Sequence, residues 1–144
     1  MIAVDSNILV YAHREDMDGH RIAAARLTEL ASGSAAWSIP WPCAHEFLAT
    51  VTRPRYFDPP STLAQAGAAL LRWLESPGLL MLHEGPAHMD LLLRVLQRAR
   101  VAGPLVHDAR IVAICLANGV SALWSADRDF SRFPDLKIVN PLVA

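Results

Sequence analysis

Short apolar segments alternate along this chain with longer segments whose apolar residues recur at helical spacing. The short runs are typical of buried strands, and the i, i+3, i+4, i+7 spacing is typical of helices. Strands that alternate with helices form parallel βαβ units. We therefore predict an α/β protein, a three-layer α/β/α sandwich with a mainly parallel central sheet. The expected strands are 2–4, 36–39, 79–82, 120–125 and 137–139, and the expected helices are about 8–13, 20–32, 43–52, 62–76, 86–100 and 108–118.

The length and composition of the chain fit one folded domain over residues 1–144. Apolar residues make up 53% and charged residues 19%, which excludes a disordered chain. The formal net charge of −1 argues against wrapping of duplex nucleic acid by bulk electrostatics, although a local basic rim is compatible with it. Dinucleotide binding is excluded, because no Gly-x-Gly-x-x-Gly follows the first strand.

The cysteines and the longest apolar run predict a cytoplasmic protein that does not cross a membrane. Cys43 and Cys115 lie far apart and form neither a zinc motif nor a disulfide framework. No basic segment precedes an apolar one at the N-terminus, so we expect no signal peptide. The run Ile111–Ala117 is far shorter than the roughly 20 residues that a membrane-spanning helix needs.

Four acidic residues fall at places where an α/β sheet forms its working site, the carboxyl ends of the strands. Asp5 closes the first strand, Asp108 is expected to open the most apolar helix, and Asp127 comes shortly after a late strand. Glu46 flanks the apolar stripe of its helix, from where it can reach a cleft. Each acid also has a structural interpretation, as a helix cap, a turn residue or a solvated side chain.

A cluster of four carboxylates is tolerable only if protons or cations offset their repulsion. A like-charged pair about 4 Å apart costs on the order of 4 kcal/mol at an effective dielectric near 20. Oxygen-only ligands favour Mg²⁺, or Mn²⁺ in its place, over zinc. Carboxylate-held Mg²⁺ suits displacement at phosphorus, because a bound metal activates the attacking water and stabilises the leaving oxygen.

The chain resembles PIN-domain ribonucleases over essentially its whole length, and more narrowly the VapC toxins of type II toxin–antitoxin pairs. The segments that carry the resemblance are VDSNIL at 4–9, HEFL at 45–48, VHDA at 106–109 and SADRDF at 125–130, supported by FPDL at 133–136 and NPL at 140–142. The resemblance implies a PIN-like fold and a Mg²⁺-dependent endoribonuclease that cuts a structured RNA, such as a tRNA or an rRNA loop, leaving a 5′-phosphate and a 3′-hydroxyl.

Carried over by position, the resemblance implies that Asp5, Glu46, Asp108 and Asp127 are the catalytic acids and metal ligands, with Asp5 and Asp108 the firmest ligands. Ser6, Asn7 and Ser125 would contact these ligands or the phosphate. Asp129 is a second candidate for the last acid, although Asp127 is favoured because it lies nearer the end of the strand.

Basic and aromatic residues near these motifs are candidates for RNA contact. Arg53, Arg55 and Tyr56 lie in one loop that mixes both types, as contacts to single-stranded RNA do. A loop that faces a protein partner or solvent fits equally well. Arg110 and Arg128 either contact phosphate or form surface ion pairs. His45 and His107 are interpreted as boundary residues rather than metal ligands.

The resemblance also implies a VapB-type antitoxin as partner, an RNA substrate and a homodimer. We expect that a basic side chain of the antitoxin enters the acidic cluster and displaces metal. The alternative to a nuclease is a PIN-like module that binds RNA or protein without cutting. The presence of all four acids disfavours that alternative.

Overall fold

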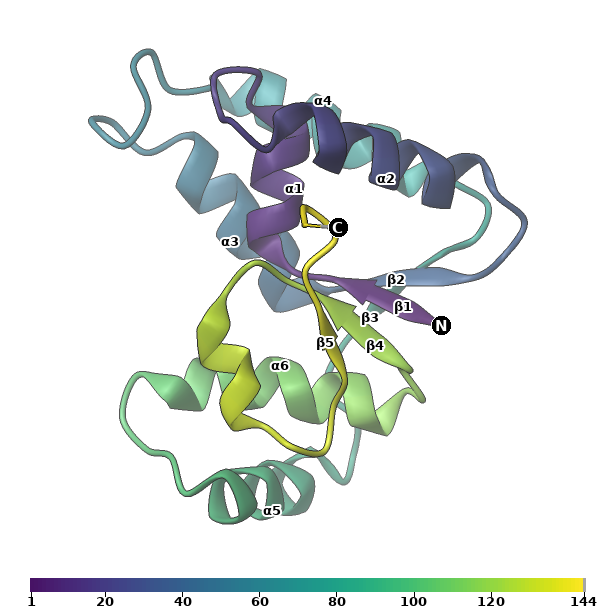
Figure 1. Ribbon diagram of the computed structural model, residues 1–144, viewed down its shortest axis with the longest axis vertical. Coiled ribbons are helices and arrows are strands. Elements are labelled where there is room, and N and C mark those ends of the chain that lie inside the picture. Colours follow the sequence, from purple (N-terminus) through teal and green to yellow (C-terminus); the bar gives the residue numbers. More distant parts are fainter. Residues whose placement is uncertain (144) are drawn as a thin grey trace.

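The computed structural model describes residues 1–143 and contains a five-stranded parallel sheet in the order β3-β2-β1-β4-β5 (Figure 1). The strands are β1 (Ile2–Val4), β2 (Trp37–Pro40), β3 (Leu79–Leu82), β4 (Ala122–Trp124) and β5 (Ile138–Val139). Strands β2 and β3 lie on one side of β1, and β4 and β5 lie on the other. The order therefore reverses at β1, which is where open α/β sheets place their ligand sites.

Helices cover both faces of the sheet, which confirms the predicted three-layer α/β fold. Figure 1 shows α1 to α4 on one side and α5 and α6 on the other. The helices are α1 (Ser6–His13), α2 (His20–Ser32), α3 (Trp41–Val51), α4 (Leu63–Leu74), α5 (His88–Ala99) and α6 (Leu105–Ala117), followed by the 3₁₀ helix η1 (Arg128–Arg132). None of the helices in residues 1–143 combines the length and apolarity that a membrane span needs.

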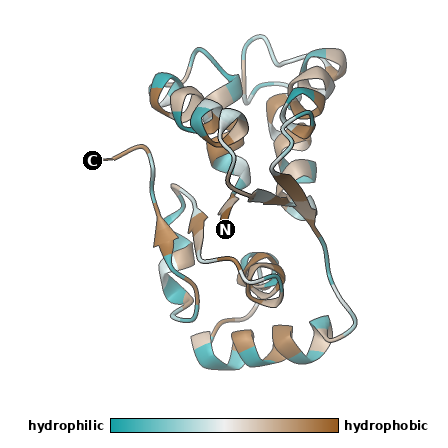
Figure 2. Ribbon diagram, turned by 90° about the vertical axis from the view of Figure 1, so that its right-hand side faces the viewer, coloured by the Kyte–Doolittle hydropathy of each residue, from teal (hydrophilic) through white to brown (hydrophobic). Residues whose placement is uncertain are grey.

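The core forms where the apolar strands meet α1, α3 and α6, and Figure 2 shows the strands as its most hydrophobic part. Helix α6 has buried residues on most of its circumference, from Ala109 to Cys115. This burial confirms the prediction that the most apolar helix is central. Its length of 13 residues lets it run beneath the sheet and bring its first turn to the carboxyl ends of the strands.

Several helix starts differ from the sequence predictions, and α5, for example, begins at His88 instead of residue 86. Helix α6 begins at Leu105, so Asp108 lies in its first turn instead of opening it. Helix α3 begins at Trp41, because Pro42 lacks an N–H that the first turn would leave unpaired anyway. Helix α1 begins at Ser6 instead of residue 8, and its N-cap is Asp5, whose side chain accepts from the Ser6 N–H.

Candidate active site

All four acids that the sequence singled out line one cleft of about 230 Å³ at the carboxyl ends of the strands. Asp5 follows β1, Glu46 lies on α3, Asp108 on α6, and Asp127 follows β4. A second groove of about 1120 Å³, bordered by α2 and α4, contains none of them. The smaller cleft is therefore the candidate site. Its lining also includes residues that the sequence analysis did not single out: Val10, Tyr11, Met17, Thr50 and Phe130.

Asp5 is buried at the base of this cleft and accepts four hydrogen bonds. Its Oδ1 accepts from the backbone N–H of Ser6 at 2.8 Å and from the thiol of Cys43 at 3.4 Å. Its Oδ2 accepts from Asn7 Nδ2 at 2.8 Å and from Ser125 Oγ at 2.7 Å. Each oxygen thus has two donors, which fixes the orientation of a carboxylate with an exposed fraction of only 2%.

Asn7 and Ser125 join the ends of β1 and β4. Asn7 Nδ2 also donates to Ser125 Oγ at 3.1 Å, and Asn7 Oδ1 accepts from the backbone N–H of Ala126 at 3.0 Å. Ser125 Oγ accepts in addition from the backbone N–H of Asp127 at 3.0 Å. These bonds couple the position of Asp127 to that of Asp5. Ser6, Asn7 and Ser125, which the resemblance implied as contacts of the acids or the phosphate, all donate to Asp5, Ser6 through its backbone N–H.

Cys43 is a contact of Asp5 that sequence reasoning missed. It lies on α3 one turn before Glu46, and that spacing of three positions is the signal that places both side chains on one face of the helix. Burial raises the pKa of the Cys43 thiol well above its ordinary value, and the charge of Asp5 acts in the same direction. The thiol therefore keeps its proton and acts as a donor.

Two carboxylates of the cleft, those of Asp5 and Asp108, have raised pKa values. Burial raises the pKa of Asp5, although the hydrogen bonds from Ser125, Ser6 and Cys43 oppose the rise. Partial burial raises the pKa of Asp108 to about 6, and the charges of Asp127, Asp5, Asp129 and Glu46 add to the rise. A site that raises carboxyl pKa values in this way also favours a cation, which relieves the same repulsion.

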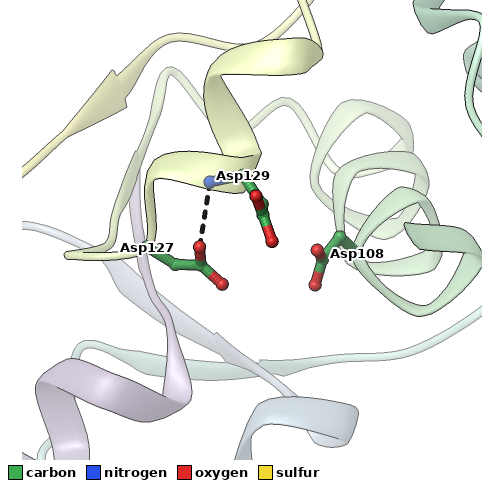
Figure 3. Close-up of side chains that lie close together, drawn as sticks. All are labelled: Asp108, Asp127 and Asp129. Carbon is green, nitrogen blue, oxygen red and sulfur yellow. Dashed lines mark hydrogen bonds between the residues drawn. The ribbon is translucent and has the colours of Figure 1, made fainter. Parts of the chain in front are cut away.

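Asp108, Asp127 and Asp129 form the group that fits a metal ion (Figure 3). Each offers a carboxylate oxygen, and these oxygens lie within 4.8 Å of one another. Asp127 Oδ1 accepts from the backbone N–H of Asp129 at 2.9 Å, which holds η1 against the end of β4. A donor set of three carboxylates suits a hard divalent cation. The structure thus brings both Asp127 and Asp129 to Asp108, whereas Asp5 is not part of this group.

The remaining sequence candidates divide into two that line the cleft and others that do not. Glu46 is exposed and lines the cleft. Tyr56 lines it as well, and the Arg53 guanidinium lies 5.8 Å from the centre of its ring. Arg110 forms an ion pair with Glu84, which lowers the pKa of that carboxyl. The exposed residues near the acids that do not line the cleft are Arg55, Arg128, His45 and His107.

Comparison with known proteins agrees with this geometry. Residues 2–136 match the PIN domain family. The chain is 32% identical over 142 residues to Ribonuclease VapC33 of Mycobacterium tuberculosis (strain CDC 1551 / Oshkosh), and the match covers 99% of each chain.

Two solved structures share the fold. One is VapBC2 from Rickettsia felis bound to a DNA fragment from its promoter, with a TM-score of 0.68, 19% identity and coverage of 96% of this chain and 98% of the other. The other is VapC20 of Mycobacterium tuberculosis, a Sarcin-Ricin loop cleaving toxin, with a TM-score of 0.66, 18% identity and coverage of 91% and 93%. The chain therefore belongs to the PIN domain family and, through its full-length likeness to a VapC ribonuclease, to the VapC group of that family.

Proposed function

We propose that this protein is a divalent-metal-dependent endoribonuclease and the toxin of a type II toxin–antitoxin pair. The observation that carries the proposal is the meeting of Asp5, Glu46, Asp108 and Asp127 in one cleft. The relatives that are most similar along the whole chain are named ribonucleases, which supports RNA as the substrate. We infer a structured RNA, such as a tRNA or an rRNA loop, as the target.

The residues of the cleft have different roles in this proposal. Asp108, Asp127 and Asp129 would hold Mg²⁺ or Mn²⁺. When bound, such an ion offsets the carboxylate repulsion and lowers the pKa of a coordinated water. Glu46, exposed at the rim, accepts the proton that the attacking water loses. Asp5, fixed by its four donors, holds negative charge at the base of the cleft and keeps Asp127 in position through Ser125.

The reaction is displacement at phosphorus. The water oxygen bonds to the phosphorus, and the bond from phosphorus to the 3′ oxygen breaks. The 3′ oxygen takes a proton from solvent, so the products carry a 5′-phosphate and a 3′-hydroxyl.

Cleavage of a tRNA and rRNA mixture in Mg²⁺, in Mn²⁺ and in EDTA tests the activity. We expect the unsubstituted protein to cut with either ion and not in EDTA. Asp5→Asn and Asp108→Asn should each reduce cleavage by about 100-fold or more, because they remove charge that the site needs. Asp90→Asn is the matched control, since Asp90 is exposed on α5 and outside the cleft. Cleavage that survives Asp5→Asn, or that is absent from every sample, would support a non-catalytic binding module instead.

We further propose a VapB-type antitoxin as partner. The toxin of Rickettsia felis that shares this fold was solved together with its antitoxin. Charge complementarity favours a basic side chain of the antitoxin in the acidic cleft, where it would take the place of the metal. The test compares nuclease activity of the free protein with that of a purified stoichiometric complex. Undiminished activity in the complex contradicts this mode of inhibition.

A further inference from the structure

The loop between α3 and α4 holds an exposed aromatic ring at the rim of the acidic cleft. Tyr56 lines the cleft together with Asp5, Glu46, Asp108 and Asp127, yet 57% of the residue is exposed. A large aromatic side chain that is left open beside a site of clustered charge is not explained by packing. We propose that Tyr56 forms a nucleobase subsite, on which an unpaired base next to the cleaved phosphate stacks.

The loop is held in place by the residue that follows. Phe57 is buried, with an exposed fraction of 8%, and its ring meets that of Tyr56 edge to face at 5.0 Å and 75°. The guanidinium of Arg14, the C-cap of α1, lies 4.4 Å from the centre of the Phe57 ring, so the end of α1 also contacts this anchor. An aromatic pair of this geometry fixes the orientation of both rings. Tyr56 is thus positioned before any ligand arrives, which lowers the entropy cost of binding to it.

The charges around Tyr56 favour a base over other groups. The carboxylates of the cleft repel the phosphates of an RNA strand wherever no cation offsets them, so a contact that does not depend on net charge adds affinity at this place. Stacking of a base on an aromatic ring is such a contact. The Arg53 guanidinium, 5.8 Å from the centre of the Tyr56 ring, adds a cation at the same place for the neighbouring phosphate.

The subsite selects unpaired nucleotides. Inside a duplex both faces of a base are covered by its neighbours, so only a base in a loop, a bulge or a single strand can lie on Tyr56. The inference rests on the proposed ribonuclease function and narrows its substrate class to RNA that is unpaired at the cut. A protein partner as the ligand of Tyr56 is the competing outcome, and the following experiment separates the two.

Binding of short RNA oligonucleotides that carry 2-aminopurine is measured by fluorescence on the Glu46→Gln variant, in Ca²⁺ to suppress cleavage. Tyr56→Leu in this background should weaken binding of single-stranded RNA by about tenfold, a typical loss for one stacked base. Tyr56→Phe should bind normally, because it keeps the ring. Val143→Ala is the control, since Val143 is similarly exposed, at 64%, but lies after β5 and outside the cleft.

The outcomes are distinguishable. The subsite is overturned if single-stranded RNA binds the Tyr56→Leu variant as tightly as it binds the parent. It is also overturned if the variant loses binding of the antitoxin but keeps binding of RNA. If Tyr56→Leu weakens binding of a duplex oligonucleotide as much as binding of a single strand, the preference for unpaired bases is overturned. If the unsubstituted protein cleaves no RNA but binding still depends on Tyr56, the ribonuclease proposal fails and the subsite stands. Replacing single bases with abasic sites in the parent complex then identifies the stacked nucleotide.

Discussion

At the scale of single residues, the central feature of the candidate site is the set of hydrogen bonds that the Asp5 carboxylate accepts. Asp5 accepts from Ser6, Asn7, Cys43 and Ser125, and these donors come from three separate parts of the chain. Ser6 and Asn7 follow directly in the sequence, so their role was predictable from position. Cys43 and Ser125 reach Asp5 only through tertiary packing. The one signal for Cys43 was its spacing of three positions from Glu46, and it was easily missed because a buried cysteine usually behaves as a small apolar residue.

The contact between Cys43 and Asp5 predicts a different response to two substitutions of similar size. Cys43→Ser keeps a donor to Asp5 Oδ1, whereas Cys43→Val fills the space without one. A lost hydrogen bond to a buried group costs on the order of 1 kcal/mol, so we expect Cys43→Val to reduce kcat by about fivefold. Cys43→Ser should stay within about twofold of the parent. Chemical denaturation of both variants reveals any general loss of stability.

Equal loss of kcat in the two variants would point to packing alone as the role of Cys43. A shift in the metal concentration that half-saturates cleavage should accompany Cys43→Val, because Asp5 affects Asp127 through Ser125. A merely structural role leaves that concentration unchanged.

The raised pKa of Asp108 predicts how the stability of the metal-free protein depends on pH. The pKa is 3.8 in the unfolded chain and about 6 in the folded protein, so the folded state binds more protons between these values. Stability from this group is therefore lost as the pH rises from about 4 through about 6. Thermal unfolding in EDTA at about pH 5 and about pH 8 measures the loss. Asp108→Asn should show a smaller decrease in Tm, because it cannot ionise.

Added Mn²⁺ provides the matched comparison. It should raise the Tm of the parent at about pH 8, where the carboxylates are ionised, and have less effect at about pH 5, where protons compete. The Asp108→Asn variant should respond weakly at both. An equal pH dependence in parent and variant would contradict the assigned cause.

At the scale of helices and strands, the pattern of apolar residues predicted that strands alternate with helices, but it did not fix the first and last residue of each element. The three-layer arrangement followed from short runs between periodic segments, and the structure confirms it. The helix starts were predicted less accurately. Helix α1, for example, begins at Ser6, because Asp5, the residue directly after β1, caps it. Helix α6 begins three residues before Asp108. Its N-cap, Pro104, already has helical backbone angles, so the helix starts at Leu105.

The sequence around Asp127 and Asp129 also did not predict that both carboxylates lie near Asp108. Proximity to the strand favoured Asp127 as the single last acid, yet the tight 3₁₀ turn of η1 brings both carboxylates toward Asp108. Asp127 is the N-cap of η1 and Asp129 lies in its first turn, where the Asp129 N–H donates to Asp127 Oδ1, so this turn holds the two residues close together. Only the packing of η1 on α6 decides this.

The end of α5 predicts a stabilising substitution. Its C-cap, Arg100, has a φ of 55°, a left-handed conformation that costs an L-residue with a side chain about 1 kcal/mol. The backbone N–H of Val101 bonds to the Leu96 carbonyl across this turn, as helix ends closed by glycine do. Arg100→Gly should raise the free energy of unfolding by about 0.5 kcal/mol, measured in urea. A decrease would show that the Arg100 side chain contributes more than its backbone costs.

At the scale of the whole molecule, the homodimer that the family resemblance implies stays a prediction. Several large apolar side chains are exposed, namely Ile22, Leu63, Leu71, Leu80, Met89 and Leu93. They lie on four different elements, and single exposed apolar side chains are common on protein surfaces, so they do not by themselves mark an interface. Light scattering of the purified protein should give twice the mass of one chain. A mass equal to one chain at micromolar concentration would contradict the dimer.

The parallel pairing of β1 with β4 has a consequence for synthesis. Residues 2–4 pair with residues 122–124, and Ser125 bonds to Asp5 across most of the polypeptide. Because translation proceeds from the N-terminus, a ribosome-bound fragment that ends before β4 lacks Asp127 and Asp129 and leaves this edge of β1 unpaired. Under the proposed function, the growing chain cannot cut the RNA of the ribosome that makes it until residues 122–129 have been added.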